Sequence, residues 1–179
     1  GGISVIQYRD KISDRSEFLE NSFKLKEICD SNQIPLIVND AVDVAVLTNS
    51  YGVHLGQSDL PIQYARKILL PDQVIGLSND GIQQSKESEI NGADYVAVGA
   101  IYQTSSLGKS NRAPVGLKNL QQVTKSIAAP VVAIGGINEN NLYDVKKTGV
   151  DAVCIVSDIT LADTPEHKVK QLSKIWTEL

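Results

Sequence analysis

The chain has 179 residues, of which 42% are hydrophobic and 21% are charged, so it has enough apolar material for one packed domain. Its 17 lysines and arginines are outnumbered by 21 aspartates and glutamates, and the basic surplus of a nucleic-acid-binding protein is missing. No apolar run approaches the roughly 20 residues that cross a bilayer, and the two cysteines form neither a zinc motif nor a disulfide framework. We therefore expect a cytoplasmic protein with no nucleic-acid partner and no membrane partner.

Short hydrophobic segments recur along the chain and predict seven β-strands. Each segment is apolar nearly throughout rather than alternating, which is typical of strands that are covered on both faces. The predicted strands cover residues 3–8, 35–38, 52–55, 74–77, 95–101, 130–134 and 152–156.

Polar segments with helical spacing separate these strands. The segment at 14–31 places Phe18, Leu19, Phe23, Leu25 and Ile28 along one side of a predicted helix. Thr164 followed by Pro165 is typical of an N-cap and a first helical position, and this pair opens the last predicted helix. The chain is therefore expected to alternate between strands and helices up to its end.

Seven alternations of strand and helix predict βαβ units and a parallel sheet. The Gly-x-Asp triplets at 92–94 and 149–151 both stand between a helix and a strand, as in an internal repeat. No G-x-G-x-x-G follows the first strand, as it would in a doubly wound nucleotide-binding fold. Polar residues instead follow every strand, which favours an α/β fold of the TIM-type (β/α)8 barrel, whose site is spread over the strand ends.

A full barrel needs eight βα units, and seven can be counted here. The chain also contains no methionine, not even at its first position. We therefore expect a single barrel domain over residues 1–179 that lacks the first βα unit, in a chain that is processed or part of a longer one.

Three polar side chains alternate at the end of the first predicted strand. Alternation would aim Gln7, Arg9 and Lys11 in the same direction. A guanidinium fork and an ammonium suit the oxygens of a diphosphate. The alternative is a strand end whose charges are simply solvated.

Two carboxylates follow the next two predicted strands. Asp40 comes directly after Asn39, and Asp59 follows the third strand. Mg²⁺ prefers one or two carboxylates together with substrate phosphates, so these residues predict a magnesium site. The alternative is that Asp59 caps the helix after Pro61 and that Asn39 and Asp40 cap a short helix at 41–47.

The last strands end in residues that suit a phosphate. Gly135-Gly136 and Ser157 occupy the corner where barrels often bind phosphate through backbone N–H groups. The alternative is two turns that require glycine. The segment 104–109 adds Thr104, Ser106 and Lys109, which read either as a lid or as a plain polar loop.

The remaining reactive residue types do not form a covalent catalytic set. His54 lies among apolar neighbours and is expected to be packed, His167 is expected to be solvated, and Cys154 is expected in the core. No pairing of a nucleophile with a base is visible among the strand-end residues. An anionic substrate held by metal and cations, without a covalent nucleophile, indicates departure of a diphosphate.

These motifs together resemble those of the thiamine-phosphate synthase family. The most specific are Gln7-x-Arg9-x-Lys11, Asn39-Asp40 and the segment GVHLGQSDL at 52–60. Further matches are IGLS at 75–78, GADY at 92–95, VAIGGI at 132–137 and the pair at 156–157. The matches follow the family order over almost the whole chain, and the family's opening strand and helix have no counterpart.

The resemblance implies a transferase that joins an aminopyrimidine diphosphate to a thiazole phosphate, giving thiamine phosphate and pyrophosphate. By the same resemblance, the pyrimidine diphosphate is bound by Gln7, Arg9, Lys11, Asn39 and Ser78, Mg²⁺ by Asp40 and Asp59, and the thiazole phosphate by Thr104, Ser106, Gly136, Val156 and Ser157. Ser78 and Lys109 are the implied catalytic residues, with Lys109 assisting the leaving pyrophosphate. The implied mechanism is dissociative, and the family often forms dimers, so a homo-oligomer is among the expectations.

Two departures from the family pattern concern the loop after the fifth strand and the residue after Ser78. The family usually reads Pro-Thr-x-Thr-Lys, whereas Lys109 stands two positions later here, and Asn79 replaces a threonine. Two alternatives to the synthase remain at this point. One is a thiazole tautomerase-like barrel that needs neither diphosphate nor metal, and the other is a non-catalytic binder of a phosphate ligand.

Overall fold

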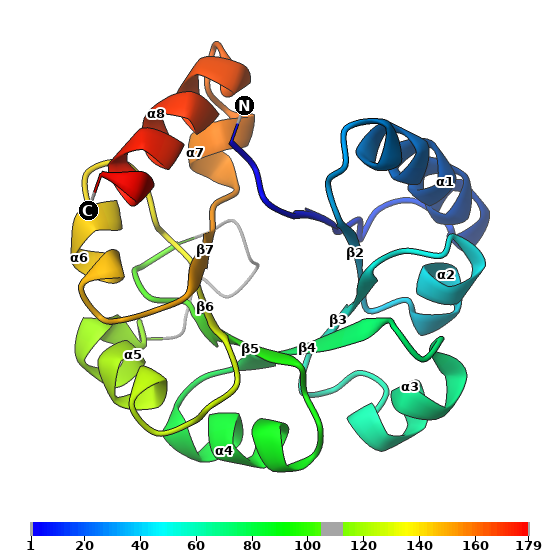
Figure 1. The fold of residues 1–179 in the computed structure, drawn as a ribbon, viewed down its shortest axis with the longest axis horizontal. Coiled ribbons are helices and arrows are strands. Elements are labelled where there is room, and N and C mark those ends of the chain that lie inside the picture. The colour runs from blue at the N-terminus through cyan, green and yellow to red at the C-terminus, as the bar shows by residue number, and fades with distance from the viewer. Residues whose placement is uncertain (1, 105–112, 179) are drawn as a thin grey trace. The chain divides into compact units, whose positions relative to one another are not determined.

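The computed structural model describes residues 2–104 and 113–178, and parallel strands alternate with helices throughout them (Figure 1). The described strands are β1 (Ile6–Tyr8), β2 (Leu36–Asn39), β3 (Gly52–Leu55), β4 (Val74–Asn79), β5 (Tyr95–Gly99), β6 (Val131–Ile134) and β7 (Ala152–Cys154). The described helices are α1 (Arg15–Ser31), α2 (Val42–Leu47), α3 (Ile62–Ile68), α4 (Ile82–Ile90), α5 (Gly116–Thr124), α6 (Leu142–Lys146), α7 (Ser157–Thr160) and α8 (Pro165–Thr177). The seven predicted strands are therefore confirmed, in the repeating order of a TIM-type fold.

Several boundaries differ from the prediction. The first strand begins at Ile6 rather than Ile3, and residues 3–5 are exposed. The fifth and seventh strands end two residues early, at Gly99 and Cys154, whereas β4 continues to Asn79. The fifth and seventh strands are shorter than predicted because apolar residues continue into the loops that follow them.

The contacts of the chain divide it into two compact units. The N-terminal unit comprises Ile3–Leu77 and Asn91–Asp94. The C-terminal unit comprises Ser78–Ile90 and Tyr95–Leu179, together with Gly2. The expectation of a single domain remains a prediction, and each unit is described by itself.

In the N-terminal unit, neighbouring strands are parallel and follow chain order. Tyr8 pairs with Val38, and Asn39 pairs with His54, so β1, β2 and β3 end at a common edge. The buried core includes Phe18, Val38, Val42, Val44, Val53, Leu55, Ile62 and Ile75. Helices α1, α2 and α3 pack against one face of these strands (Figure 1).

Helix α1 matches its predicted bounds, but its buried face is narrower than predicted. Asp14 is the N-cap, and its side chain accepts a hydrogen bond from Glu17 N–H at 3.0 Å. Phe18 is buried, whereas Phe23 and Ile28 are about half exposed, at 49% and 58%. The side of the helix predicted from the apolar residues therefore does not coincide with its buried face.

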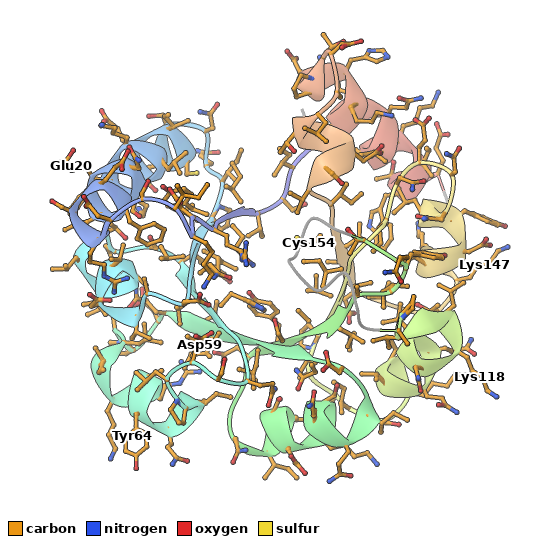
Figure 2. The ribbon with its side chains drawn as sticks, turned by 180° about the vertical axis from the view of Figure 1, so that it is seen from behind. Glu20, Asp59, Tyr64, Lys118, Lys147 and Cys154 are labelled. Atoms are coloured by element: carbon orange, nitrogen blue, oxygen red, sulfur yellow. The ribbon has the colours of Figure 1, made fainter. Side chains whose placement is uncertain are left out.

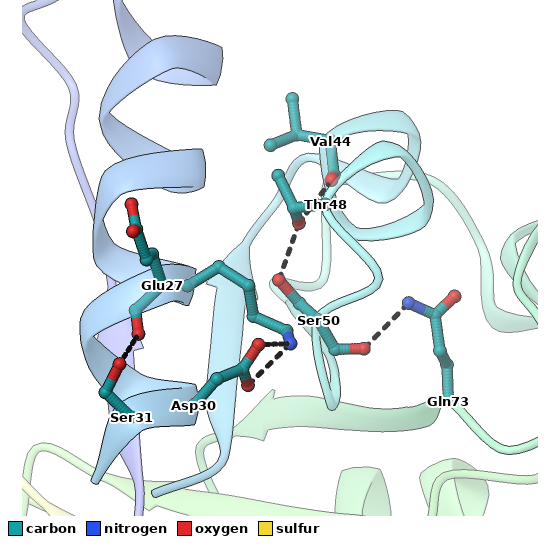
Figure 3. Close-up of polar contacts among 8 residues, drawn as sticks. Glu27, Asp30, Ser31, Val44, Thr48, Ser50 and Gln73 are labelled. Carbon is teal, nitrogen blue, oxygen red and sulfur yellow. Dashed lines mark hydrogen bonds and ion pairs between the residues drawn. The ribbon is translucent and has the colours of Figure 1, made fainter.

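The buried side-chain amide of Gln73 connects, through hydrogen bonds, the loops that precede strands of this unit. Gln73 Nε2 donates to the carbonyl oxygens of Ala45 at 2.7 Å and Ser50 at 2.8 Å, and Gln73 Oε1 accepts from Leu70 N–H at 2.9 Å. Thr48 and Ser50 share a hydrogen bond at 2.6 Å beside it (Figure 3). This network lies at the amino ends of the strands, where barrel residues serve stability, and leaves the carboxyl ends for a site.

The C-terminal unit repeats the same construction. Strands β5, β6 and β7 are parallel neighbours, with Gly99 opposite Ile134 and Ile134 opposite Cys154. The core is formed by Val96, Val98, Leu120, Val123, Ala133, Leu142, Val145 and Leu172. Thr164 is the N-cap of α8 and Pro165 its first residue, as predicted, although the Thr164 side chain makes no capping bond.

The internal repeat is confirmed by two equivalent aspartates, one in each unit. Asp94 Oδ2 accepts from Ile75 N–H at 2.7 Å, and Asp94 N–H donates to the Ile75 carbonyl at 2.8 Å. Asp151 makes the same pair of bonds to Val131, at 2.7 and 3.0 Å. Each aspartate thus connects, through two hydrogen bonds, the turn before one strand to the start of the preceding strand.

No described helix combines the length and the apolar character that a membrane span requires.

Candidate active site

A cation and two carboxylates meet at the carboxyl ends of the strands in the N-terminal unit. Lys11, in the loop after β1, forms an ion pair with Asp40, which follows β2. Asp59, in the segment after β3, accepts a hydrogen bond from Gly56 N–H at 2.7 Å. Figure 2 shows Asp59 beside the strands, whereas Tyr64 on α3 and Glu20 on α1 point outward. Three predicted site residues are therefore brought together.

The two carboxylates influence each other electrostatically. Burial raises the pKa of Asp59, and the neighbouring Asp40 carboxylate raises it further. The Gly56 N–H bond and the Lys11 charge act in the opposite direction. Two like charges that face each other in this way are stabilised by a divalent cation, and carboxylate oxygens are the ligands that Mg²⁺ prefers. The residues present therefore fit a magnesium ion held jointly with substrate phosphates.

Asp40 adopts a backbone conformation that side chains rarely occupy. Its φ is +61°, its N–H donates to the His54 carbonyl at 2.8 Å, and the next residue, Ala41, donates to the Asn39 carbonyl at 2.8 Å. A non-glycine residue in the left-handed region stores strain, which often marks a functional position. The surrounding hydrogen bonds hold Asp40 in this turn.

The alternative in which these residues cap helices is wrong. The N-cap of α2 is Ala41 and that of α3 is Pro61, and neither helix has a side-chain cap. Asp59 instead bonds back to Gly56. The Asp40 and Asp59 side chains therefore serve contacts at the strand ends and not the helix N-termini.

The other predicted phosphate ligands of this unit lie close in sequence to these residues. Gln7 is half-buried in β1, opposite Ile37, and Asn39 is half-buried at the end of β2. Because β1 ends at Tyr8, Arg9 and Lys11 lie beyond the strand, and Arg9 is exposed. Strand alternation therefore accounts for Gln7 but does not by itself orient Arg9 and Lys11.

In the C-terminal unit, the glycine pair after β6 fits closely against the segment after β5. Gly135 and Gly136 have φ values of +101° and +68°. A Cβ on Gly136 would lie 2.7 Å from Tyr102 Cβ and 2.9 Å from the Gln103 carbonyl oxygen. Glycine is required here both for the left-handed backbone and for the close approach.

Asn141 holds the loop that begins with Gly136. Its Nδ2 donates to the Gly136 carbonyl at 2.9 Å, and its Oδ1 accepts from Asn138 N–H at 2.9 Å. Asn138 Oδ1 in turn accepts from Asn140 N–H at 2.9 Å. Hydrogen bonds within the loop therefore stabilise its conformation.

Three of the predicted phosphate residues of this unit line one small pocket. The pocket has a volume of about 20 Å³ and is lined by Ile134, Gly135, Gly136, Ile137, Cys154, Val156 and Ser157. Gly136, Val156 and Ser157 are thus brought together as expected. Cys154 is half-buried at this pocket rather than in the core as predicted, and burial raises the pKa of its thiol.

A second pocket, of about 230 Å³, lies beside the segment after β5. It is lined by Asp80, Gly99, Ala100, Tyr102, Gln103, Thr104, Ala113, Pro114, Val115 and Asn119. Thr104 lies in this wall, whereas Ser106 and Lys109 fall outside the described residues. Ser78 is half-buried within β4, and the adjacent Asn79 is buried and accepts from Ser88 Oγ at 2.7 Å.

The two histidines behave as predicted. His54 is buried in β3, and this burial lowers the pKa of the imidazole to about 4, although the Asp40 charge partly opposes the shift. His54 is therefore neutral near neutral pH. His167 is exposed on α8.

Sequence reasoning missed three supporting residues: Gly56, Asn141 and Lys168. Gly56 donates to Asp59, Asn141 fixes Gly136, and Lys168 on α8 pairs with Glu139 at 2.8 Å. The run of three asparagines at 138, 140 and 141 was a usable signal, because asparagine side chains stabilise turns. No sequence pattern pairs Lys168 with Glu139.

Comparisons with known proteins agree with this arrangement. Residues 1–159 match the family described as thiamine monophosphate synthase. The chain is 42% identical to the thiamine-phosphate synthase of Clostridium acetobutylicum over 179 residues, which cover 100% of this chain and 82% of the relative. It is also 42% identical to that of Halalkalibacterium halodurans over 175 residues, which cover 98% and 82%.

Solved structures show the same likeness. Thiamine phosphate pyrophosphorylase from Pyrococcus furiosus is 35% identical and superimposes with a TM-score of 0.92, over 99% of this chain and 85% of that protein. A 3-hexulose-6-phosphate synthase from Salmonella typhimurium, at 17% identity and a TM-score of 0.70 over 88% of this chain and 80% of that protein, shares the fold alone. These superpositions confirm the predicted α/β TIM-type fold.

Proposed function

Because the chain belongs to the thiamine-phosphate synthase family, we propose that it transfers the pyrimidine group of an aminopyrimidine diphosphate to a thiazole phosphate, in a Mg²⁺-dependent reaction. The products are thiamine phosphate and pyrophosphate. The observation that carries this proposal is the ion pair of Lys11 with Asp40 beside the Asp59 carboxylate, at the ends of three adjacent strands. A tautomerase that uses neither diphosphate nor metal has no need of this cluster.

In this proposal, residues of the N-terminal unit bind the diphosphate, and Ser78 of the C-terminal unit is assigned to the same substrate. Asp40 and Asp59 hold Mg²⁺, which supplies positive charge to the leaving diphosphate oxygens. Arg9 and Lys11 contact the same oxygens, while Gln7, Asn39 and Ser78 contact the pyrimidine diphosphate. The positive charges of Mg²⁺, Arg9 and Lys11 act mostly in the transition state, because negative charge grows on the diphosphate as it leaves.

The C-terminal unit binds the second substrate in this proposal. Gly136, Val156 and Ser157, which line the small pocket, and Thr104 receive the thiazole phosphate, with Ser106 as a further ligand. The C–O bond to the diphosphate breaks first, and the resulting pyrimidine cation is attacked by the thiazole nitrogen. Ser78 and Lys109 assist this step, with Lys109 at the departing pyrophosphate.

The direct test measures pyrophosphate and thiamine phosphate with both substrates, with and without Mg²⁺. We expect Mg²⁺-dependent release of both products in equal amounts. Asp40→Asn should lower kcat about 100-fold, because one of two carboxylate ligands is lost. Asp43→Asn is the matched control, since Asp43 is an exposed carboxylate on α2 that pairs with Arg15.

Other outcomes would contradict the proposal. Equal turnover by Asp40→Asn and the unchanged protein would remove the metal role of Asp40. Isomerisation of a thiazole substrate without Mg²⁺ would favour a tautomerase. Tight binding of both substrates without any product would favour a non-catalytic binder.

A further inference from the structure

Lys168 on α8 lies against both segments that carry the predicted thiazole-phosphate ligands. Its Nζ is 2.8 Å from Glu139 Oε2, in the loop that begins with Gly136. The same Nζ is 3.9 Å from Asp158 Oδ2, and Asp158 is the residue after Ser157. The Lys168 side chain is only 19% exposed, so it is held between these segments rather than extended into solvent.

Both carboxylates form ion pairs with this cation. Asp158 Oδ2 is buried and receives no hydrogen bond from any residue in the described part of the chain. Burying a carboxylate oxygen without a partner is unfavourable unless a nearby charge compensates it. The hydrogen bond to Glu139 also raises the pKa of Lys168, so the ammonium stays charged at any pH at which the protein would work.

The position of these charges matters for an anionic ligand. Glu139 comes three residues after Gly136, and Asp158 is adjacent to Ser157. A phosphate bound at Gly136 and Ser157 would therefore meet two nearby negative charges if Lys168 were absent. Charge repulsion over distances up to about 10 Å is only partly screened by salt where the groups are half-buried.

We infer that Lys168 is a positioning residue for the phosphate of the thiazole substrate, acting through Glu139 and Asp158 by neutralising their charge. The inference rests on the proposed function, because it assumes that the pocket at Gly136 and Ser157 binds this phosphate. Lys168 itself is assigned no contact with the ligand. Its effect is on the affinity of the phosphate pocket and not on the chemical step.

The test compares steady-state kinetics of Lys168→Met, Lys168→Arg and the unchanged protein. Lys168→Met should raise KM for the thiazole phosphate about five-fold, with kcat and KM for the pyrimidine diphosphate unchanged. Lys168→Arg, which keeps the charge, should stay within about two-fold of the unchanged protein. Lys170→Met is the matched control, because Lys170 lies on the same helix in an exposed pair with Glu166.

A second variant distinguishes charge compensation from a purely structural role of the Lys168–Glu139 contact. Adding Glu139→Gln to Lys168→Met removes one of the two uncompensated charges and leaves Asp158, so KM for the thiazole phosphate should return part of the way. A double variant as impaired as Lys168→Met alone would overturn the inference, and so would an unchanged KM in Lys168→Met. If Lys168→Met does not fold, Glu139→Gln alone decides: we expect it to lower this KM, and a higher KM would overturn the inference.

Failure of the proposed function can be told apart from failure of this inference. If the unchanged protein makes no thiamine phosphate, the proposed function fails, and the inference, which assumes it, falls as well. If the unchanged protein is active and Lys168→Met has the same KM for both substrates, only the role of Lys168 is lost. An equal rise in both KM values would likewise contradict a role confined to the phosphate pocket.

Discussion

The Asp59 carboxylate is held by the backbone of Gly56, whose N–H donates to Asp59 Oδ2 at 2.7 Å. There is no room for a side chain at residue 56, because a Cβ added to Gly56 would lie 2.9 Å from that oxygen. Asp59 is thus both hydrogen-bonded and confined by a residue in the turn after β3. Its position as a metal ligand depends on the absence of a side chain at residue 56.

Gly56→Ala is expected to displace the Asp59 carboxylate without unfolding the protein. The methyl group meets only the flexible end of one side chain, and the backbone at Gly56 is not in the left-handed region. We expect the Mg²⁺ concentration for half-maximal activity to rise about ten-fold, because the ligand moves from its preorganised position. Titration of activity with Mg²⁺ and the melting temperature measure the two effects separately.

Gly81→Ala is the matched control for this substitution. A Cβ at Gly81 meets no atom within 4 Å, so the variant should titrate with Mg²⁺ like the unchanged protein. An unaltered Mg²⁺ requirement in Gly56→Ala would show that Asp59 is not confined as described, or that it does not bind the metal.

Buried His54 makes stability depend on pH. The pKa of His54 is about 4 in the folded protein and near 6.5 when exposed, because burial disfavours the charged imidazole. As pH falls below 6.5, the unfolded chain takes up a proton at His54 that the folded chain does not. The contribution of His54 to the free energy of unfolding is therefore complete above pH 6.5 and is lost towards pH 4. The loss attributable to His54 is about 3 kcal/mol over this range.

The contribution of His54 is isolated by comparing variants. His54→Gln should flatten the dependence of melting temperature on pH between about 4 and 6.5, whatever its effect at neutral pH. His167→Gln, which alters an exposed histidine on α8, should leave this slope unchanged. Parallel pH profiles for His54→Gln and the unchanged protein would contradict the assignment.

Features that repeat along the chain could be predicted from the sequence. Apolar runs located all seven strands, and the equivalent glycine-containing turns at 92–94 and 149–151 revealed a repeat whose aspartates make matching bonds. In a parallel sheet, strand ends gather side chains from distant parts of the chain. Lys11 with Asp40, and Gly136 with Ser157, could therefore be grouped in advance.

Features that depend on non-repeating tertiary contacts could not be predicted. Lys168 and Glu139 are 29 positions apart, and no periodicity relates a helix surface to a loop. Phe23 and Ile28 are about half exposed, because steps of five residues from Phe18 turn about 140° each around the helix and leave its buried face. Cys154 was assigned to the core because of its apolar neighbours, but the strand ends there and the side chain lines a pocket.

Gly136→Ala should impair both stability and binding of the thiazole phosphate. The φ of +68° strains any L side chain, and the added Cβ would lie 2.9 Å from the Gln103 backbone, which cannot move aside easily. We expect the melting temperature to fall by about 4–8 °C and KM for the thiazole phosphate to rise about ten-fold.

Gly92→Ala separates backbone strain from steric crowding. Gly92 has a φ of +92°, but its Cβ would meet no atom within 4 Å. This variant should therefore lose about 2–4 °C and keep its KM. Equal losses in both variants would mean that the contact with Tyr102 and Gln103 is unimportant.

Asn141 gives the most specific test of how the phosphate loop is held. Asn141→Ala removes two hydrogen bonds, from Nδ2 to the Gly136 carbonyl and from Asn138 N–H to Oδ1, and should lower stability by about 1–2 kcal/mol. Asn141→Asp keeps the acceptor and loses only the donor to Gly136. Asn140→Ala alters an exposed neighbour whose backbone N–H alone takes part in the loop, and it should behave like the unchanged protein.

The two Asn141 variants are expected to differ in a defined way. If the bond to Gly136 sets the shape of the phosphate pocket, Asn141→Asp raises KM for the thiazole phosphate at least as much as Asn141→Ala, because it also places a negative charge beside the loop. If the bond to Asn138 is the important one, Asn141→Asp retains the KM of the unchanged protein. Because the Gly136 carbonyl belongs to the residue assigned to the phosphate, we expect the first result, measured as KM at fixed pyrimidine diphosphate and Mg²⁺.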